Sequence, residues 1–246
     1  MSEISLSPQS SKENFTRFLG YFIGATVSIS LLTLSNIFIN TDPNKFKDNY
    51  VLIVSLAFVT FIYFLDDTIQ LHQINAQHPY DWNKSFRRLL SDVFIVIFFY
   101  FSLAALNTNS LVMYKTFVFL AFFFSFVWAD KLKDEVPFDQ RELHFASAYK
   151  FLYGFFSIIL LLCLFGSAQI KCDPNNKILA SLINISDFFG NDGIFLIIFC
   201  AFYLLHDISL IIFKCYKSEG AIDFPLGFLS RIVLQVIEKF GQNNRR

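Results

Sequence analysis

The apolar run of residues 50–72 constrains the fold of this chain more than any other feature. Nearly every residue from Tyr50 to Leu65 is aliphatic or aromatic, and the run is interrupted abruptly by Asp66 and Asp67. A helix needs roughly 20 apolar residues to cross the hydrocarbon core of a bilayer, because each residue adds only about 1.5 Å. The run is therefore long enough to form a membrane-spanning helix.

An aromatic residue stands four positions before an aspartate at the end of three apolar segments, and residues four apart share one face of a helix. The three pairs are Tyr63 and Asp67, Phe126 and Asp130, and Tyr203 and Asp207. This recurrence favours three helical hairpins of similar design, formed by the first and second, third and fourth, and fifth and sixth apolar segments.

The composition excludes an ordinary soluble domain. Hydrophobic residues make up 54% of the 246 positions, 34 residues are Phe, charged residues make up only 16%, and the mean hydropathy is +0.49. Soluble domains carry about 25% charged residues. The formal net charge of zero gives no global attraction to nucleic acid. We therefore predict a membrane domain that embeds in the lipid bilayer, with no separate soluble domain and no nucleic-acid partner.

Six segments approach or reach the length of a spanning helix. They lie at residues 17–39, 50–71, 88–106, 110–130, 146–169 and 193–214. The predicted fold is an all-α integral membrane protein, a six-helix transmembrane bundle over residues 17–214. Residues 1–16 form a polar N-terminus, and residues 215–246 form a tail.

The basic residues predict the orientation of the bundle. If the N-terminus is cytoplasmic, fifteen lysine and arginine residues fall on the cytoplasmic side and five on the other. The positive-inside rule then places both termini in the cytoplasm. The small size, and a Phe, Ile, Asn and Lys usage that suits an AT-rich genome, favour a bacterial inner membrane.

The tail predicts one amphipathic helix after Pro225. Phe228, Ile232, Val236 and Phe240 fall on one face, whereas Arg231, Gln235 and Lys239 fall on another. Such a helix lies on the inner leaflet, covers the end of the bundle, or binds another subunit. The interfacial position is the simplest of these.

Charged residues inside apolar helices are the main functional lead, because an ionisable group in hydrocarbon is costly and usually has a partner or a function. The candidates are Arg17, Asp67, Arg88, Asp92, Asp130, Lys150, His206 and Asp207. One interpretation is an ion pair within each hairpin, joining Arg17 to Asp67, Arg88 to Asp130 and Lys150 to Asp207. The other is an acidic ring or relay at an inner vestibule that binds cations or shuttles protons.

Two further patterns concern the small residues of the first segment and the histidine of the last. Gly20, Gly24 and Ser28 recur every four residues and predict close helix packing, more simply within the chain than between chains. His206 adjoins Asp207, but neighbouring helix residues point in different directions, so they do not form an obvious dyad. We predict no metal and no cofactor, because the four cysteines are scattered and the histidines lack ligand spacing.

These patterns favour a channel-like or membrane-perturbing homo-oligomer whose acids border an inner vestibule. One alternative is a non-catalytic anchor or sensor that binds a cytosolic protein through the inner loops and the tail. Another is a membrane-embedded lipid or phosphate enzyme that uses Asp66 and Asp67, although no phosphate loop or nucleophile motif supports catalysis.

Overall fold

The computed structural model describes residues 8–40, 50–77, 80, 85–135, 140–167, 188 and 190–215. These residues form six long helices and no strand, which confirms the predicted all-α fold over this part of the chain. The helices are α1 (Pro8–Asn40), α2 (Tyr50–Gln77), α3 (Phe86–Asn107), α4 (Leu111–Glu135), α5 (Gln140–Ser167) and α7 (Asp192–Cys215). The predicted amphipathic helix of the tail lies outside the described residues.

Five of the six helices are long and apolar enough to cross a membrane, so the chain is a polytopic membrane protein by helix length and hydropathy. The spans are Arg17–Ile39, Tyr50–His72, Phe86–Asn107, Leu111–Glu135 and Asp192–Ser209. In α5 the apolar stretch is shorter and covers Lys150–Phe165. The prediction of six spanning segments is thus confirmed for five, and the α5 segment, predicted at 146–169, is shorter than a full span in the described residues.

Helix α1 begins earlier than predicted. It starts at Pro8, inside the stretch that the sequence indicates as a polar N-terminus, and reaches the apolar segment without a break. Proline fits the first turn of a helix, where its missing N–H would have no helical partner. The apolar pattern marks where a helix enters lipid, and polar residues can extend the same helix into water.

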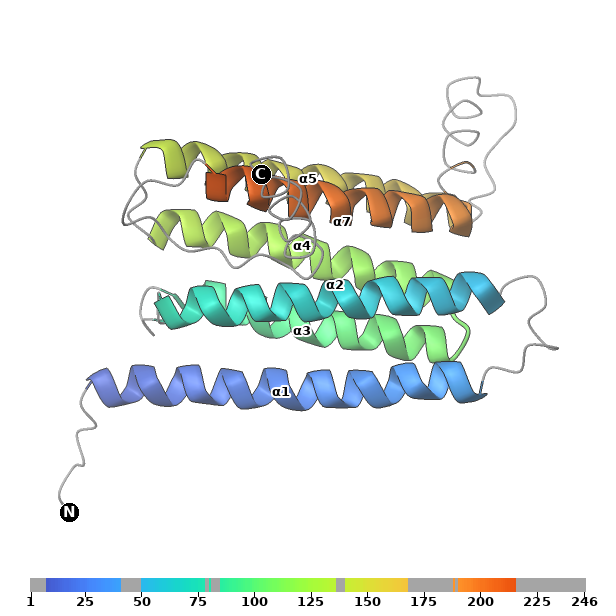
Figure 1. Cartoon of the computed structure of the whole chain (residues 1–246), viewed down its shortest axis with the longest axis horizontal. Coiled ribbons are helices and arrows are strands. Elements are labelled where there is room, and N and C mark those ends of the chain that lie inside the picture. Colours follow the sequence, from blue (N-terminus) through green and yellow to red (C-terminus); the bar gives the residue numbers. More distant parts are fainter. Residues whose placement is uncertain are drawn as a thin grey trace, which may run out of the picture.

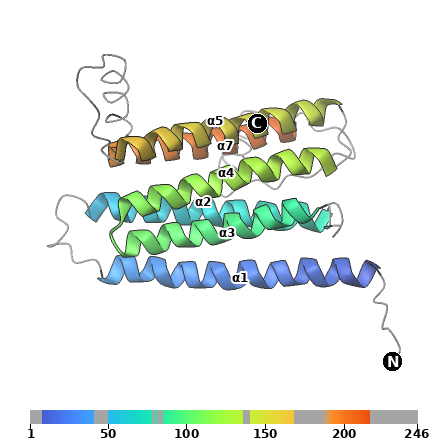
Figure 2. The ribbon, with the colours of Figure 1, turned by 180° about the vertical axis from the view of Figure 1, so that it is seen from behind.

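Figures 1 and 2 show the helices running side by side, with α1 along one edge and α5 and α7 at the opposite edge. Helices α3 and α4 have the most extensive contact, and α1 packs against both α3 and α2. On the other side, α4 packs against α5, and α7 contacts both α2 and α5. The interior therefore lies between α2, α3, α4, α5 and α7, whereas α1 covers only one flank.

The turn between α3 and α4 makes a tight hairpin. Asn109 adopts a φ of 57°, a left-handed conformation that asparagine tolerates better than most residues. The Ser110 N–H donates to the Ala105 carbonyl, and the Asn109 N–H donates to the Leu106 carbonyl. These bonds satisfy carbonyl groups at the end of α3, which have no partner within the helix.

Aromatic rings fill the centre of the bundle. The Phe122 ring of α4 is fully buried, and its centroid lies 5.1 Å from that of Tyr63, 4.8 Å from that of Phe156 and 4.9 Å from that of Phe202. These partners belong to α2, α5 and α7. In lipid, helices are held together by such packing and by polar contacts, because apolar surface gains little by leaving an apolar solvent.

A buried lysine joins α4 to the start of α7. The Lys115 side chain is only 1% exposed, and its Nζ lies 2.6 Å from Asp192 Oδ1 and donates to the Gly190 carbonyl at 2.8 Å. The ammonium also lies 5.5 Å from the centre of the Phe195 ring. A charge buried in this way needs close partners to offset its desolvation, so this contact fixes where α7 begins against α4.

Candidate functional site: a buried network of acids, tyrosines and histidine

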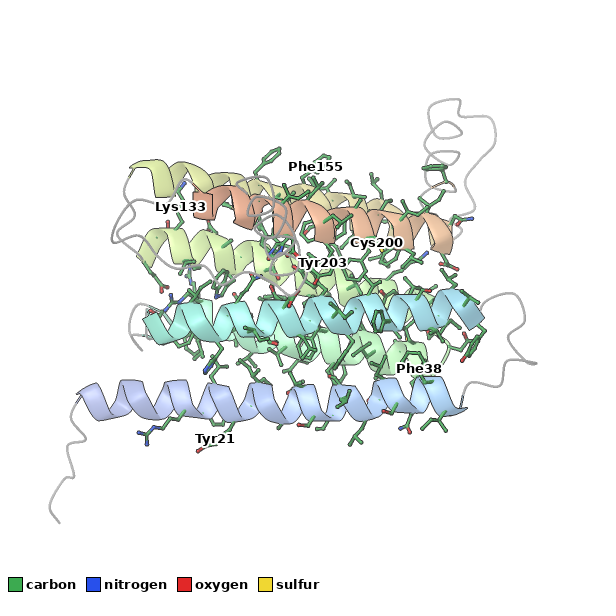
Figure 3. The ribbon with its side chains drawn as sticks, in the orientation of Figure 1. Tyr21, Phe38, Lys133, Phe155, Cys200 and Tyr203 are labelled. Atoms are coloured by element: carbon green, nitrogen blue, oxygen red, sulfur yellow. The ribbon has the colours of Figure 1, made fainter. Side chains whose placement is uncertain are left out.

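The two acids that interrupt the apolar run lie inside the bundle. Helix α2 continues past them to Gln77, so they stand within a helix and not at its end. Asp66 is 5% exposed and Asp67 is 4% exposed. The Tyr203 hydroxyl of α7 donates a hydrogen bond to Asp66 Oδ2, and Figure 3 shows Tyr203 on the side of α7 that faces α2.

The Tyr153 hydroxyl of α5 is the centre of the polar contacts. It lies 3.3 Å from the Tyr63 hydroxyl and 3.1 Å from His206 Nε2, and it is also in hydrogen-bonding reach of Asp67. A hydroxyl has one proton to donate and two lone pairs. If Tyr153 donates to Asp67, then His206 must present a protonated Nε2 and Tyr63 must donate to Tyr153.

His206 and Asp207 come together in the interior. Both are buried, and His206 Nδ1 lies 3.6 Å from Asp207 Oδ1. This separation is longer than a hydrogen bond, so it does not overturn the expectation that these neighbours form no obvious dyad. Successive residues on a helix leave the axis in different directions, and both side chains are enclosed because α7 packs against α2 and α5.

We call the seven side chains of this region the acid–tyrosine network. It consists of Tyr63, Asp66, Asp67, Tyr153, Tyr203, His206 and Asp207. Its contacts run from α2 through the single hydroxyl of Tyr153 on α5 to the imidazole of α7. Each of its carboxyl, phenol and imidazole groups can both accept and release a proton. The arrangement suits proton transfer between helices more than the recognition of a large substrate.

The network gives no metal centre in the part of the chain that is described. There, no group of three or more His, Cys, Asp or Glu side chains is placed to hold a metal ion.

No protein-family model matches this chain, and no curated protein or solved structure does either. Functional conclusions therefore depend on the geometry of the acid–tyrosine network and its surroundings.

The ion pairs differ from those that the hairpin scheme predicts. Arg88 Nε lies 3.2 Å from Glu135 Oε2, and Asp130 pairs with Lys150 of α5 and with Lys131. The predicted pair of Arg88 with Asp130 is therefore wrong. The reason is that α4 continues five residues beyond Asp130, which brings Glu135 to Arg88 and leaves Asp130 facing α5.

The other two predicted pairs are not formed in the described structure either. Arg17 is exposed on α1 and makes no ion pair with Asp67 there, and Lys150 is paired with Asp130 and not with Asp207. Asp92 is fully buried on α3, one turn from Arg88. Residues four apart share a helix face, so Asp92 and Arg88 belong to the same interior face of α3.

The small residues of α1 face mainly away from the bundle. A Cβ added at Gly20 would meet His72 Cε1 of α2 at 3.6 Å, an ordinary contact, whereas a Cβ at Gly24 would meet nothing within 4 Å. Ser28 is exposed and donates to the Gly24 carbonyl. Packing at Gly24 and Ser28 therefore stays a prediction.

Tyr153 and Glu135 were not among the predicted site residues. Tyr153 could have been found from its spacing, because Lys150, Tyr153 and Ser157 form one polar stripe on a helix that is otherwise apolar. Glu135 falls beyond the predicted end of its helix, so no signal within the apolar segment points to it.

We expect the Arg88–Glu135 pair to show strong coupling. Arg88→Gln and Glu135→Gln should each lower the free energy of unfolding by about 2 kcal/mol, because each leaves a buried charge without this partner. The double variant should cost less than the sum by about 1 kcal/mol. Thermal unfolding in detergent, followed by circular dichroism, measures all three losses.

The matched comparison is Arg88→Gln combined with Asp130→Asn. Since Asp130 is held by Lys150 and Lys131, these two losses should add to within about 0.5 kcal/mol. Coupling between Arg88 and Asp130, with additivity between Arg88 and Glu135, would instead support pairing by the hairpin scheme.

Proposed function

We propose that the chain is a channel-like membrane protein that conducts protons through the acid–tyrosine network. The observation that carries this proposal is the Tyr153 hydroxyl, which lies 3.3 Å from the Tyr63 hydroxyl and 3.1 Å from His206 Nε2, within reach of Asp67. A single exchangeable proton thus stands between acids on α2 and an imidazole on α7.

The cost of burying these groups supports a functional role. Three carboxyl groups lie inside the bundle within the spans of α2 and α7, where ionisable residues are expensive and usually mark ion or proton pathways. Asp66 and Asp67 are neighbours, and two like charges in a region of low dielectric repel each other. Uptake of a proton by either acid relieves that repulsion, which makes the pair a suitable proton acceptor.

The imidazole gives the network a second exchange point. Neutral histidine carries its proton on either ring nitrogen, and the protonated ring carries one on both. His206 faces Tyr153 through Nε2 and Asp207 through Nδ1. A proton received on one nitrogen can therefore leave from the other, on the side of Asp207.

Other buried polar contacts lie toward the opposite end of the bundle. Thr60 lies one helical turn before Tyr63 on α2, and its hydroxyl is 2.7 Å from the Tyr114 hydroxyl of α4. The next residue of α4, Lys115, pairs with Asp192. These two contacts lie outside the acid–tyrosine network, so they serve as structural contacts between helices in this proposal.

The acid–tyrosine network differs from the acidic vestibule predicted from the sequence in two respects. Asp67 and Asp207 are enclosed by helices, so the proton moves between buried groups and not along an open acidic ring. Asp130 is one-third exposed and held by lysines, and it lies outside the network. The positive-inside pattern predicts that the network lies near the cytoplasmic end. Assembly into a homo-oligomer also remains part of the proposal.

The other functions have less support from the described residues. An enzyme that uses Asp66 and Asp67 would need both acids at a surface open to its substrate, whereas each is at least nine-tenths buried. An anchor or sensor would act through the inner loops and the tail, which lie largely or wholly outside the described residues.

Proton flux into liposomes that contain the purified protein tests the proposal. A potassium gradient with valinomycin sets the voltage, and an enclosed pH-sensitive dye reports proton entry. We expect the Asp67→Asn variant to conduct about tenfold more slowly, because its amide cannot exchange the carboxyl proton while Asp66 remains as a partial substitute.

Asp134→Asn is the matched control. It makes the same chemical change on α4 at a side chain that is 61% exposed and pairs with Lys131, so its flux should equal that of the unaltered protein. Absence of flux in the unaltered protein between about pH 5 and 8, a range that covers the titration of a typical histidine, would refute proton conduction. Equal flux in Asp67→Asn would remove Asp67 from the path.

A further inference from the structure

A groove of 690 Å³ lies between α4 and α5, and its lining changes character along its length. Most of it is apolar and includes Phe119, Phe123, Phe155 and Ile158, whereas Lys133, Ser147 and Lys150 line one end. Phe155 is 54% exposed and Ile158 is 60% exposed. Figure 3 shows Phe155 on the side of α5 that faces away from the other helices, with Lys133 near the end of α4. The groove therefore faces the surroundings of the bundle.

The length of the groove matches one leaflet of a bilayer. Along α5 its lining runs from Ser147 to Leu161, which corresponds to about 21 Å of helix. Half of the hydrocarbon core is about 15 Å thick, and the headgroup region adds several ångströms more. A groove that begins at the lysines in the headgroup region would thus reach the middle of the membrane.

A glycine keeps the middle of the groove open. Gly154 lines it, and a Cβ added there would lie 3.1 Å from Phe126 Cε2, closer than almost all such contacts. The Phe126 ring in turn lies 5.4 Å from the Lys150 ammonium. A larger residue at position 154 would displace this ring and occupy the space where the polar end meets the apolar part.

Among the described side chains, lysines outnumber carboxylates at the polar end of the groove. Lys150 is paired with Asp130, and Lys131 is paired with Asp134 and Asp130. Lys133 lines the groove, and the described residues place no carboxylate within ion-pair distance of it. Among the described side chains, three ammonium groups thus lie beside two carboxylates, and Lys133, which has no described carboxylate partner, lies at the mouth of the groove.

We propose that this groove binds an anionic glycerophospholipid. Its phosphate lies against Lys133, with Lys150 and Ser147 beside it, and one acyl chain follows the phenylalanines toward the middle of the membrane. The lysines at one end of the groove and its long apolar part both favour a lipid with an anionic headgroup and an acyl chain. An apolar segment of protein would instead leave Lys133 without an anion. The proposal is independent of proton conduction, since the acid–tyrosine network lies on the inner side of α5.

Photo-crosslinking tests this proposal. The full-length protein is placed in nanodiscs of phosphatidylcholine that contain a small fraction of phosphatidylglycerol with a diazirine near the end of one acyl chain. After illumination, mass spectrometry locates the adducts. We expect adducts at Phe119, Phe123 and Ile158, and about fivefold fewer of them in Lys133→Gln, the effect of one lysine near an anionic surface.

Two matched controls separate the groove from general effects. Lys131→Gln removes a neighbouring lysine that does not line the groove, and its adducts should equal those of the unaltered protein. Gly154→Ile should lower adducts at all three positions, whereas Gly24→Ile, at a site with nothing within 4 Å, should not change them. Circular dichroism confirms that each variant is folded.

The same experiment with labelled phosphatidylcholine shows whether the groove prefers the anionic headgroup. Equal adducts from both lipids, or no change in Lys133→Gln, would overturn the headgroup site. Adducts that persist in a folded Gly154→Ile would overturn the acyl groove. Crosslinks from this face to a second copy of the chain, in place of lipid, would show that the groove is a protein interface and would also overturn the proposal.

Discussion

The Phe122→Ala variant is expected to lose about 3 kcal/mol of the free energy of unfolding, which is at the lower end of the range for a buried Phe replaced by Ala. Phe122 is fully buried, and its ring packs against rings from α2, α5 and α7, including those of Tyr63, Phe156 and Phe202. In lipid, the free energy of transferring the Phe ring between the protein interior and its surroundings is small. The loss of stability therefore comes mainly from the cavity that the alanine leaves unfilled.

Phe123 offers a control one position away. It is 42% exposed and lines the lipid-facing groove, so Phe123→Ala should change the free energy of unfolding by less than about 0.5 kcal/mol. Unfolding in mixed micelles with increasing fractions of sodium dodecyl sulfate, followed by circular dichroism, compares the two variants. Equal losses would mean that the rings around Phe122 do not form the tightly packed centre of the bundle.

The sequence predicts that α4 spans the membrane but not which of its phenylalanines is central. The chain contains 34 Phe residues, and the apolar part of α4 is hydrophobic on every face. A soluble helix reveals its buried face by the contrast with polar residues. In a bilayer the exposed face is apolar as well, so the contrast that distinguishes Phe122 from Phe123 is absent.

The length of the apolar runs predicts most of the spanning helices, whereas the hairpin scheme predicts the wrong ion pairs. Run length predicts the spanning helices because the bilayer sets a minimum number of residues. The hairpin scheme, however, assumed that α4 ends at Asp130 and that each charge pairs with the adjacent helix of its own hairpin. Glu135 lies on the part of α4 beyond the apolar run, and the contact of α4 with α5 crosses between two hairpins.

The buried acids were found from the sequence, but their connection was not. A charged residue in an apolar segment is conspicuous, so Asp67, His206 and Asp207 stood out. Tyrosine is common in membrane helices for its ring alone, and nothing local shows that the Tyr153 hydroxyl meets groups from two other helices. That information depends on how α2, α5 and α7 pack together.

Tyr153→Phe should lower proton flux by about a hundredfold, the lower end of what a well-placed proton donor or acceptor contributes. The change removes one oxygen and its proton and keeps the ring, whose centroid lies 6.2 Å from that of Phe122. It should therefore break the connection between Asp67 and His206 without opening a large cavity. The loss should exceed that of Asp67→Asn, because no second hydroxyl joins the same three partners in the described network.

Tyr114→Phe distinguishes a broken path from a weakened fold. Tyr114 is also fully buried, and its hydroxyl has a partner in Thr60 at 2.7 Å. Both variants remove a buried hydroxyl, so each should cost about 1 kcal/mol in the free energy of unfolding. If the hydrogen-bonded bridge at Tyr153 limits the flux, Tyr153→Phe should slow it far more than Tyr114→Phe does. Equal flux in the two variants would mean that this bridge does not limit conduction, since they differ mainly in which partners the lost hydroxyl had joined.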